Sequence, residues 1–296
     1  MTRPIDTLLT ALAPAIWGST FLVTTEYLPD GYPVTVSLLR ALPAGLLLLL
    51  LVRKLPPRDW LGRLFILGGL NYTLFWIALF IGAYRLPGGV AATIGSVQPL
   101  MVIFLASLLL GHRIAPLAVL AALSGLGGVA LLLLGPEARL DPVGIAASLT
   151  SAAAMASGTV LSRKWQPPVS MLTFTAWQLT AGGLLLIPAA LILEPPLPAL
   201  TAENILGLAY LGLIGAALTC FLWLRGISRM EPSAVSALAF LSPVTATLLG
   251  WAILDQSLTP LQLTGVLIIL ASVWFSQHLA SRPSTPKTQT VKGITT

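Results

Sequence analysis

The chain has 296 residues, of which 56% are hydrophobic and only 9% are charged, and its formal net charge is +6. A soluble domain carries about 25% charged residues, so this composition excludes a water-facing globular protein and indicates a chain that crosses a membrane many times. The basic residues lie in short loops between apolar segments, which accounts for the positive charge without nucleic-acid binding. The single cysteine, Cys220, excludes an internal disulfide framework and a multi-cysteine metal site.

Ten segments are apolar and long enough to span a bilayer, because about 20 helical residues cross ~30 Å of hydrocarbon. Helices are expected since lipid offers the backbone no hydrogen-bond partners. The first segment is as long as a full span and follows one Arg3, so we interpret it as a retained helix rather than a cleaved signal peptide. In chain order, the predicted spans are residues 7–26, 33–52, 61–84, 88–110, 115–134, 142–162, 169–193, 204–226, 233–253 and 260–279.

The distribution of charge sets the expected orientation. With both termini in the cytoplasm, every basic residue except Arg40, Arg85 and Arg139 falls on the cytoplasmic side of the predicted spans. Most acidic residues fall on the other side. This bias follows the positive-inside rule. The sequence therefore predicts a multi-pass protein of a bacterial-type inner membrane, with the lipid bilayer as its surroundings.

The two halves of the chain share one pattern. Residues 35–48 match residues 173–186, and Pro99 matches Pro243. Internal repeats within a membrane are typical of transporters. Because each half holds five spans, an odd number, the second half enters the membrane in the opposite direction. The predicted fold is all-α, with ten transmembrane helices arranged as two inverted five-helix repeats, residues 1–137 and 138–280, and a disordered cytoplasmic tail, residues 281–296.

Short motifs spread over residues 7–280 carry a family resemblance. They are Trp17-Gly18 with Phe21, Pro33 with Arg40, Ala78 with Tyr84, Pro99, Trp177-Gln178, Pro243-Val244 with Leu249-Gly250, and Gln262 with Gly265. In order and spacing they resemble the drug/metabolite transporter superfamily, in particular its ten-helix EamA-type members. The chain is most similar there to the YddG-type exporters, which implies export of aromatic amino acids and methionine. The family often has Gly-Glu after helices 4 and 9, where this chain has Gly111-His112 and Asp255-Gln256.

Mid-span prolines indicate a substrate site between the repeats. Pro99 and Pro243 each remove a backbone hydrogen bond near the midplane, where free carbonyls are tolerated only against protein or a wet cavity. Their neighbours Gln98 and Ser242 are equivalent in the two repeats and offer hydrogen bonds to an ammonium or a carboxylate. A structural kink alone is the alternative. The predicted hinge residues are Gly18, Gly95, Pro99 and Pro243.

Aromatic residues predict the walls of that site. Trp17 lies well inside the first span, and Trp76 forms an i, i+4 stripe with Tyr72 and Phe80. Such walls suit an aromatic or thioether side chain, although helix packing and lipid contact are the alternatives. The cavity is expected between helices 1, 3, 4, 6, 8 and 9. The predicted substrate contacts are Trp17, Asn71, Phe75, Trp76, Gln98, Ser157, Gln178, Phe221, Phe240 and Ser242.

Arg40 is the one basic residue well inside a predicted span, which by default suggests a function. It lies about eight residues from the outer end, so snorkelling to the surface, an ion pair with Glu26 or Asp30, and attraction of a substrate carboxylate all fit. No Asp, Glu or His lies near a span centre. Because proton-coupled carriers normally need such a group on the pathway, its absence indicates facilitated export.

The sequence thus favours a transporter that exports small neutral amino acids, with no cofactor, no metal and no required protein partner. Four alternatives remain. An open channel-like facilitator is one, and counterflow and saturation separate it from an alternating-access carrier. A permease for another apolar metabolite or drug has the same architecture. A membrane-embedded enzyme predicts turnover without a closed compartment, and no catalytic constellation supports it. A scaffold predicts no flux and a co-purifying partner.

Overall fold

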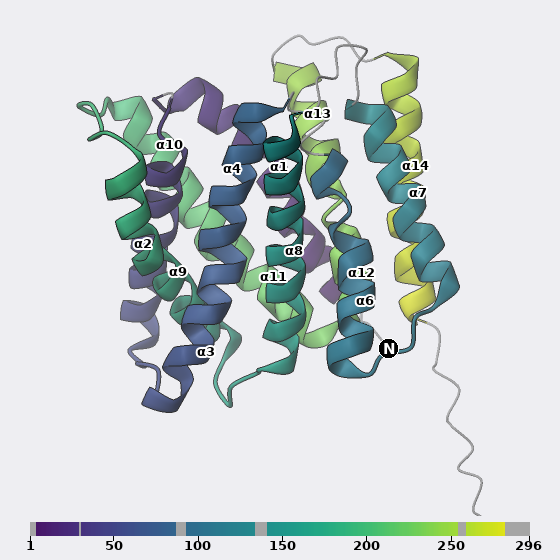
Figure 1. Cartoon of the computed structure of the whole chain (residues 1–296), viewed down its shortest axis with the longest axis horizontal. Helices are drawn as coiled ribbons and strands as arrows, with labels where there is room; N and C mark the ends of the chain where they lie inside the picture. The colour runs from purple at the N-terminus through teal and green to yellow at the C-terminus, as the bar shows by residue number, and fades with distance from the viewer. Residues whose placement is uncertain (1–3, 30, 87–92, 134–140, 254–258, 282–296) are drawn as a thin grey trace, which may run out of the picture.

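The computed structural model describes residues 4–29, 31–86, 93–133, 141–253 and 259–281. The predicted boundary between the halves, at residues 137 and 138, and the predicted tail beyond residue 281 lie outside these ranges. Within them the regular elements are helices, which run in alternating directions through one bundle (Figure 1). They are α1 (Pro4–Tyr27), α2 (Pro33–Val52), α3 (Arg58–Gly68), η1 (Gly69–Leu74), α4 (Phe75–Arg85), α6 (Gln98–Leu110), α7 (Pro116–Leu133), α8 (Pro142–Lys164), α9 (Met171–Leu193), α10 (Ala202–Gly212), η2 (Leu213–Leu218), α11 (Thr219–Arg229), α12 (Pro232–Leu238), α13 (Leu241–Ile253) and α14 (Pro260–Ser281).

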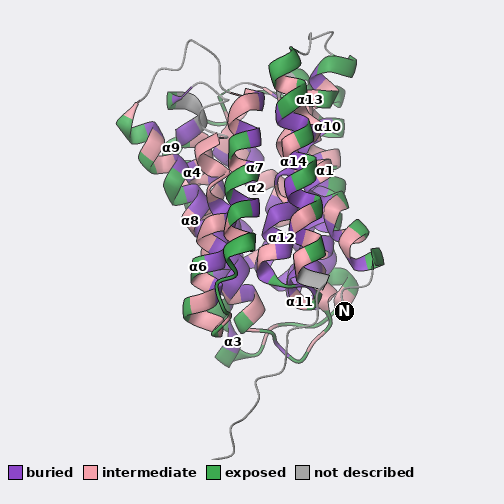
Figure 2. Cartoon of the chain, turned by 90° about the vertical axis from the view of Figure 1, so that its right-hand side faces the viewer, coloured by how far each residue is buried: buried purple, intermediate pink, exposed green. Residues whose placement is uncertain are grey.

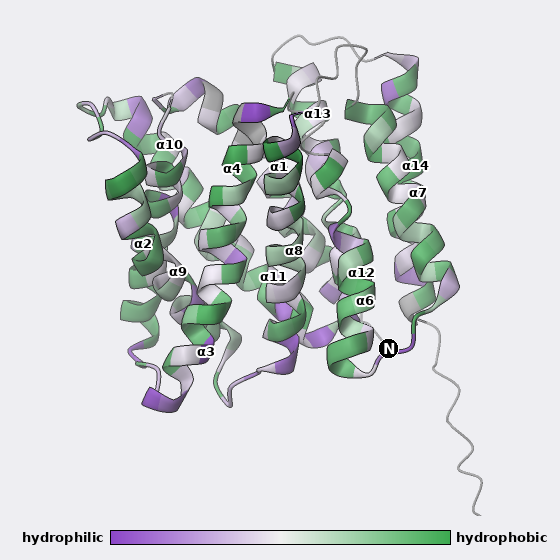
Figure 3. Cartoon of the chain, in the orientation of Figure 1, coloured by the Kyte–Doolittle hydropathy of each residue, from purple (hydrophilic) through white to green (hydrophobic). Residues whose placement is uncertain are grey.

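Ten spans of the described residues are long and apolar enough to cross a membrane, as the sequence predicts. Large apolar side chains cover the outside of the bundle; Leu108 is 79% exposed and Ile192 80%. Hydrophilic residues gather at the two ends (Figure 3), and the buried residues lie between the helices (Figure 2). An apolar outside of this kind is stable only in lipid. The chain is therefore a multi-pass membrane protein.

The packing has the two-fold pattern of inverted repeats. Helix α2 packs along α9 at one edge of the bundle, and α7 along α14 at the other (Figure 1). The contacts are reciprocal. A Cβ on Gly45 of α2 would lie 2.6 Å from the backbone N of Thr180, and a Cβ on Gly183 of α9 would lie 2.8 Å from the Cα of Leu42. Glycine is needed at both places because two helix backbones approach each other there.

Two π-helical segments recur at equivalent positions. Gly69–Leu74 lies between α3 and α4 in the third span, and Leu213–Leu218 lies between α10 and α11 in the eighth. A π-helical turn breaks the regular hydrogen-bond ladder and leaves backbone carbonyls available to other partners. The third and eighth spans are therefore each divided near their middle.

The fourth and ninth spans are also interrupted, just before their prolines. In the fourth span the amide of Val97 donates to the carbonyl of Ile94, and in the ninth the amide of Phe240 donates to the carbonyl of Ala237. These i to i−3 bonds replace the regular α-helical ladder for about one turn. The helices resume as α6 and α13, with Pro99 and Pro243 in their first turns, where a missing amide hydrogen costs little.

Candidate functional site

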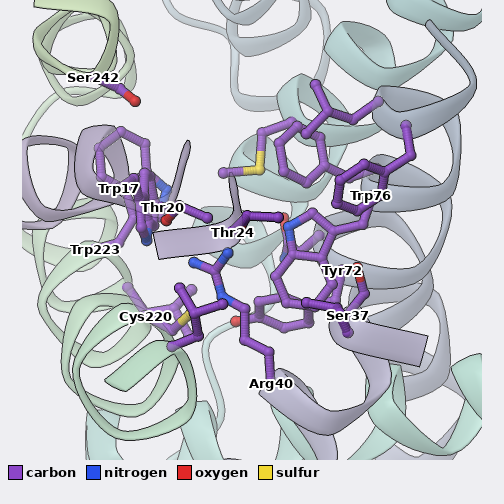
Figure 4. A pocket seen from close by; sticks show the side chains of 18 residues that line it. Trp17, Thr20, Thr24, Ser37, Arg40, Tyr72, Trp76, Cys220, Trp223 and Ser242 are labelled. Carbon is purple, nitrogen blue, oxygen red and sulfur yellow. The ribbon is translucent and has the colours of Figure 1, made fainter. Parts of the chain in front are cut away.

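A cavity of about 300 Å³ lies in the middle of the bundle (Figure 4). Its walls come from the first, second, third, sixth, eighth and ninth spans. The second span was not expected to contribute, and among the described residues the fourth does not. The cavity is lined by Trp17, Thr20, Thr24, Val36, Ser37, Arg40, Asn71, Tyr72, Phe75, Trp76, Leu79, Phe80, Met155, Leu211, Cys220, Trp223, Leu224 and Ser242.

The cavity is displaced toward one face of the bundle. We call the end at which α1 begins the N-terminal face. Thr24 lies in the last part of α1, Ser37 in the first part of α2 and Phe80 near the end of the third span. All three positions belong to the half away from the N-terminal face, so the cavity extends from the middle of the bundle toward the opposite face.

Polar contacts tie the spans together at the N-terminal face. Arg225 Nη2 at the end of α11 donates to Asp6 Oδ1 near the start of α1 at 2.5 Å, and Arg229 Nη1 lies 3.4 Å from the same oxygen. Arg163 Nη1 of α8 donates to the carbonyl of Ile227 at 2.9 Å. These contacts join α1, α8 and α11 at the N-terminal face.

Arg40 projects from α2 into the cavity and is held in two ways (Figure 4). Its Nη2 donates to the carbonyl of Gly215 at 2.5 Å, and its guanidinium carbon lies 5.1 Å from the ring centre of Trp76. Gly215 belongs to the π-helical segment η2. Among the described residues Arg40 forms no ion pair, so Glu26 is not its partner, and Asp30 lies outside those residues.

The same carbonyl anchors a second wall of the cavity. Thr219 Oγ1 donates to the carbonyl of Gly215 at 2.8 Å and accepts a hydrogen bond from Trp17 Nε1 at 2.9 Å. The ring centres of Trp17 and Trp223 are 5.2 Å apart. A chain of hydrogen bonds therefore fixes Trp17 relative to Arg40 across the eighth span.

Asn71 occupies the place in the first repeat that Gly215 occupies in the second. Its Nδ2 donates to Gln178 Oε1 at 2.9 Å and to Ser162 Oγ at 3.2 Å. Gln178 is the repeat mate of Arg40, and Asn71 is the mate of Gly215, so this contact is the counterpart of the Arg40–Gly215 bond. Each pair joins one residue of each repeat. The Arg40–Gly215 pair places a cation in the cavity, whereas the Asn71–Gln178 pair forms a neutral, buried amide contact.

Five of the ten predicted substrate contacts line the cavity, and five do not. The first group is Trp17, Asn71, Phe75, Trp76 and Ser242, and the second is Gln98, Ser157, Gln178, Phe221 and Phe240.

The five predicted contacts that do not line the cavity are held elsewhere by their local packing. Gln178 is fully buried against Asn71, and Gln98 is buried at the start of α6. The Phe240 ring fills the space beside Gly125, where a Cβ would lie 2.3 Å from the ring. Phe221 packs into an apolar cluster, and Ser157 lies two residues from the lining Met155, which is about 200° around α8.

The predicted hinge residues have unlike surroundings. A Cβ on Gly18 would lie 2.6 Å from the carbonyl oxygen of Ser242, so α1 and α13 touch at this point. A Cβ on Gly95 would meet nothing within 4 Å. Pro99 is buried and Pro243 half-buried, each in the first turn after a helix break. The breaks are structural; whether they act as hinges stays a prediction.

Several lining residues were not singled out as contacts. Cys220, Trp223 and Leu224 share one face of α11 at i, i+3, i+4 spacing. Thr20 and Thr24 share a face of α1 in the same way, together with Trp17. Helical periodicity applied to Trp17 would have found the threonines.

The cavity lining offers few kinds of chemical group. Arg40 is the one charged side chain among the described residues of the lining, and none of them is Asp, Glu or His. In the described part of the chain, no group of three or more His, Cys, Asp or Glu residues is gathered to hold a metal ion. The cavity can bind a ligand through aromatic faces, hydroxyls and one cation.

Comparison with known proteins agrees with this architecture. The chain is 45% identical over 270 residues to protein PecM of Dickeya dadantii, covering 90% of this chain and 91% of PecM. It is 28% identical to the uncharacterized inner membrane transporter YedA of Escherichia coli K12, covering 87% and 86% of the two chains. A solved crystal structure with 21% identity has a TM-score of 0.81 over 95% of this chain and 100% of that one, and so shares the fold.

The family model of EamA-like transporters matches residues 5–134 and 142–276, one copy for each repeat. The expected likeness at family level is thereby confirmed. Of the relatives named here PecM shares the most sequence, rather than a YddG-type exporter, so the narrower likeness remains a proposal. The chain belongs to the EamA-like transporter family and is a membrane transporter, not an enzyme.

Proposed function

We propose that this transporter exports small neutral amino acids, chiefly aromatic amino acids and methionine, by alternating access between its two repeats. The observation that carries the proposal is the cavity of about 300 Å³ between the repeats, with tryptophans on two sides and polar contacts that join the helices at the N-terminal face. Aromatic rings and the thioether of Met155 favour planar or sulfur-containing side chains. Threonine and serine hydroxyls offer hydrogen bonds to polar groups.

The lining supports export without proton coupling. A proton-coupled carrier needs a group that titrates on the transport path. The described lining holds no carboxylate and no histidine, and an arginine stays charged at every physiological pH. The driving force is then the gradient of the substrate itself.

The charge bias of the loops supports a cytoplasmic N-terminal face, with both termini inside. In that orientation the contacts of Asp6 and Arg163 lie on the cytoplasmic side of the cavity, and we propose that they close it there. Substrate enters from the cytoplasm when the Asp6–Arg225 contact opens and the opposite face closes.

The test is flux into liposomes that contain the purified protein, with a panel of labelled amino acids, with and without a pH gradient. Saturable flux of aromatic amino acids or methionine that ignores the pH gradient is the expected result. Flux of another apolar metabolite without amino-acid flux would refute the substrate class and leave transport intact. Flux that stops without a proton gradient would refute the uncoupled mechanism.

A further inference from the structure

The cavity has one cation and no counter-ion within reach among the described residues. Arg40 is the single charged side chain of the described lining, and it forms no ion pair there. A charge taken out of water is costly unless it is paired and hydrogen-bonded. An anionic ligand would supply the missing partner.

The guanidinium keeps hydrogen-bond donors free for such a ligand. An arginine has five N–H donors in a planar fork. The carbonyl of Gly215 takes one of them through Nη2. Arg40 Nε is buried and has no acceptor among the described residues. A carboxylate fits this fork with two parallel hydrogen bonds, which no single carbonyl oxygen does.

The fork is also held in place before any ligand binds. The bond to Gly215 fixes one end of the guanidinium, and its contact with the Trp76 ring, 5.1 Å to the centre, fixes its plane. Thr20 adds a buried hydroxyl in the same lining that has no partner among the described residues. A group that is already ordered loses little entropy on binding, so its contacts contribute fully to affinity.

The surroundings of the fork determine the rest of the ligand. Tyr72 and Trp76 lie on one side of Arg40 in Figure 4, and Trp17 and Trp223 lie on the other. The ring centres within these pairs are 5.5 Å and 5.2 Å apart. Aromatic walls of this kind favour a flat apolar body next to the carboxylate. The described lining has no acidic side chain to pair with an ammonium.

From this geometry we infer that Arg40 is the carboxylate-binding residue of the cavity, and that the carrier accepts aromatic monocarboxylates with or without an amino group. The inference rests on the proposed function and extends its substrate class from zwitterions to anions. The hydroxyls tolerate an ammonium without requiring it. An aromatic amine that lacks the carboxylate meets only the like charge of Arg40 and is excluded.

The experiment is ligand binding to the purified full-length protein, followed by the fluorescence of its tryptophans. Three ligands share one phenyl body: L-phenylalanine, 3-phenylpropanoate and phenethylamine. We expect the two carboxylates to bind with similar affinity and the amine not to bind. The variant Arg40→Gln weakens both carboxylates by about 10- to 100-fold, as for the loss of a charge-assisted hydrogen bond. Arg40→Lys keeps the charge and recovers part of the affinity.

Arg63→Gln is the matched control. Arg63 also lies over a tryptophan, with its guanidinium carbon 5.1 Å from the ring centre of Trp60, but it does not line the cavity. This variant leaves the binding of all three ligands unchanged. If the Arg40→Gln variant does not fold, the relative affinities of the wild-type protein for the three ligands test the inference.

Three results would overturn the inference. They are equal binding of all three ligands, binding of the amine alone, and binding of phenylalanine without binding of 3-phenylpropanoate. If Arg40 were merely structural, Arg40→Lys would recover no affinity for the two carboxylates relative to Arg40→Gln. Flux of labelled phenylalanine into liposomes is measured on the same preparation. Flux without the carboxylate preference overturns this inference and leaves the proposed function standing, whereas the absence of both flux and binding overturns the two together.

Discussion

Replacing Asp6 with Asn tests whether the ion pair at the N-terminal face holds the cavity closed there. The side chains of Asp6 and Arg225 are only 10% and 15% exposed, and their charged atoms are 2.5 Å apart. Breaking a buried pair by removing one partner costs about 3–5 kcal/mol, and the remaining exposure lowers this to about 2–3 kcal/mol. We expect both side chains to face water in the alternative conformer, so the cost falls on the closed state. At 1.4 kcal/mol per decade the closed state loses roughly 30- to 140-fold in population relative to the open one.

The single cysteine provides the assay, because Cys220 lines the cavity. A small membrane-impermeant thiol reagent is added to either side of oriented membrane vesicles. The wild-type protein is labelled from the face opposite to the N-terminal face. The Asp6→Asn variant also becomes labelled from the N-terminal face. Identical sidedness and rate for the two proteins would refute a closing role for this pair.

Asp141→Asn is the matched control for that experiment. Asp141 pairs with Arg85 at the opposite face at 3.8 Å, and their side chains are 37% and 50% exposed. Pairs so exposed contribute about 0–1 kcal/mol. Asn also preserves the helix cap that Asp141 forms with the amide of Gly144. Labelling from the N-terminal face should not change in this variant.

Two further predictions concern packing and the aromatic wall. Gly18→Val pushes α1 away from the carbonyl of Ser242 and lowers the free energy of unfolding by about 1–3 kcal/mol, measured as a lower Tm in detergent. The control Gly95→Ala, at a position with open space around it, leaves the Tm unchanged. Equal Tm values for the two variants would contradict the close approach of α1 and α13. Trp17→Phe removes the hydrogen bond to Thr219 and slows transport by about two- to tenfold at equal membrane abundance. An unchanged transport rate would mean that this hydrogen bond does not position the aromatic wall of the cavity.

The spans could be predicted because membrane helices are defined by length and hydropathy. The ten predicted spans occur in the structure. The kinks expected at Pro99 and Pro243 occur instead as breaks just before each proline, which lies in the first turn of the next helix. The π-helical segments could not be predicted. Gly69–Leu74 and Leu213–Leu218 share little sequence, and what makes them π-helical is the backbone hydrogen-bond pattern rather than composition.

The cavity lining was predictable only where the helix phase was clear. The stripe of Trp76 predicts a residue that lines the cavity. The prediction also names Phe221, whereas the lining contains Trp223, two residues and about 200° away. The surroundings of Arg40 depend on the carbonyl of Gly215, which lies in a different helix 175 residues further along the chain. Contacts between distant helices decide such cases, and a single sequence does not contain them.

The central claim is that one cavity alternates between the two sides of the membrane. Counterflow tests it most directly: liposomes with the purified protein are loaded with unlabelled phenylalanine, and the uptake of labelled phenylalanine from outside is followed. The account predicts saturable uptake that is faster into loaded than into empty liposomes and is blocked by thiol modification of Cys220 in the cavity. Uptake that rises linearly with concentration and ignores the internal load would contradict alternating access.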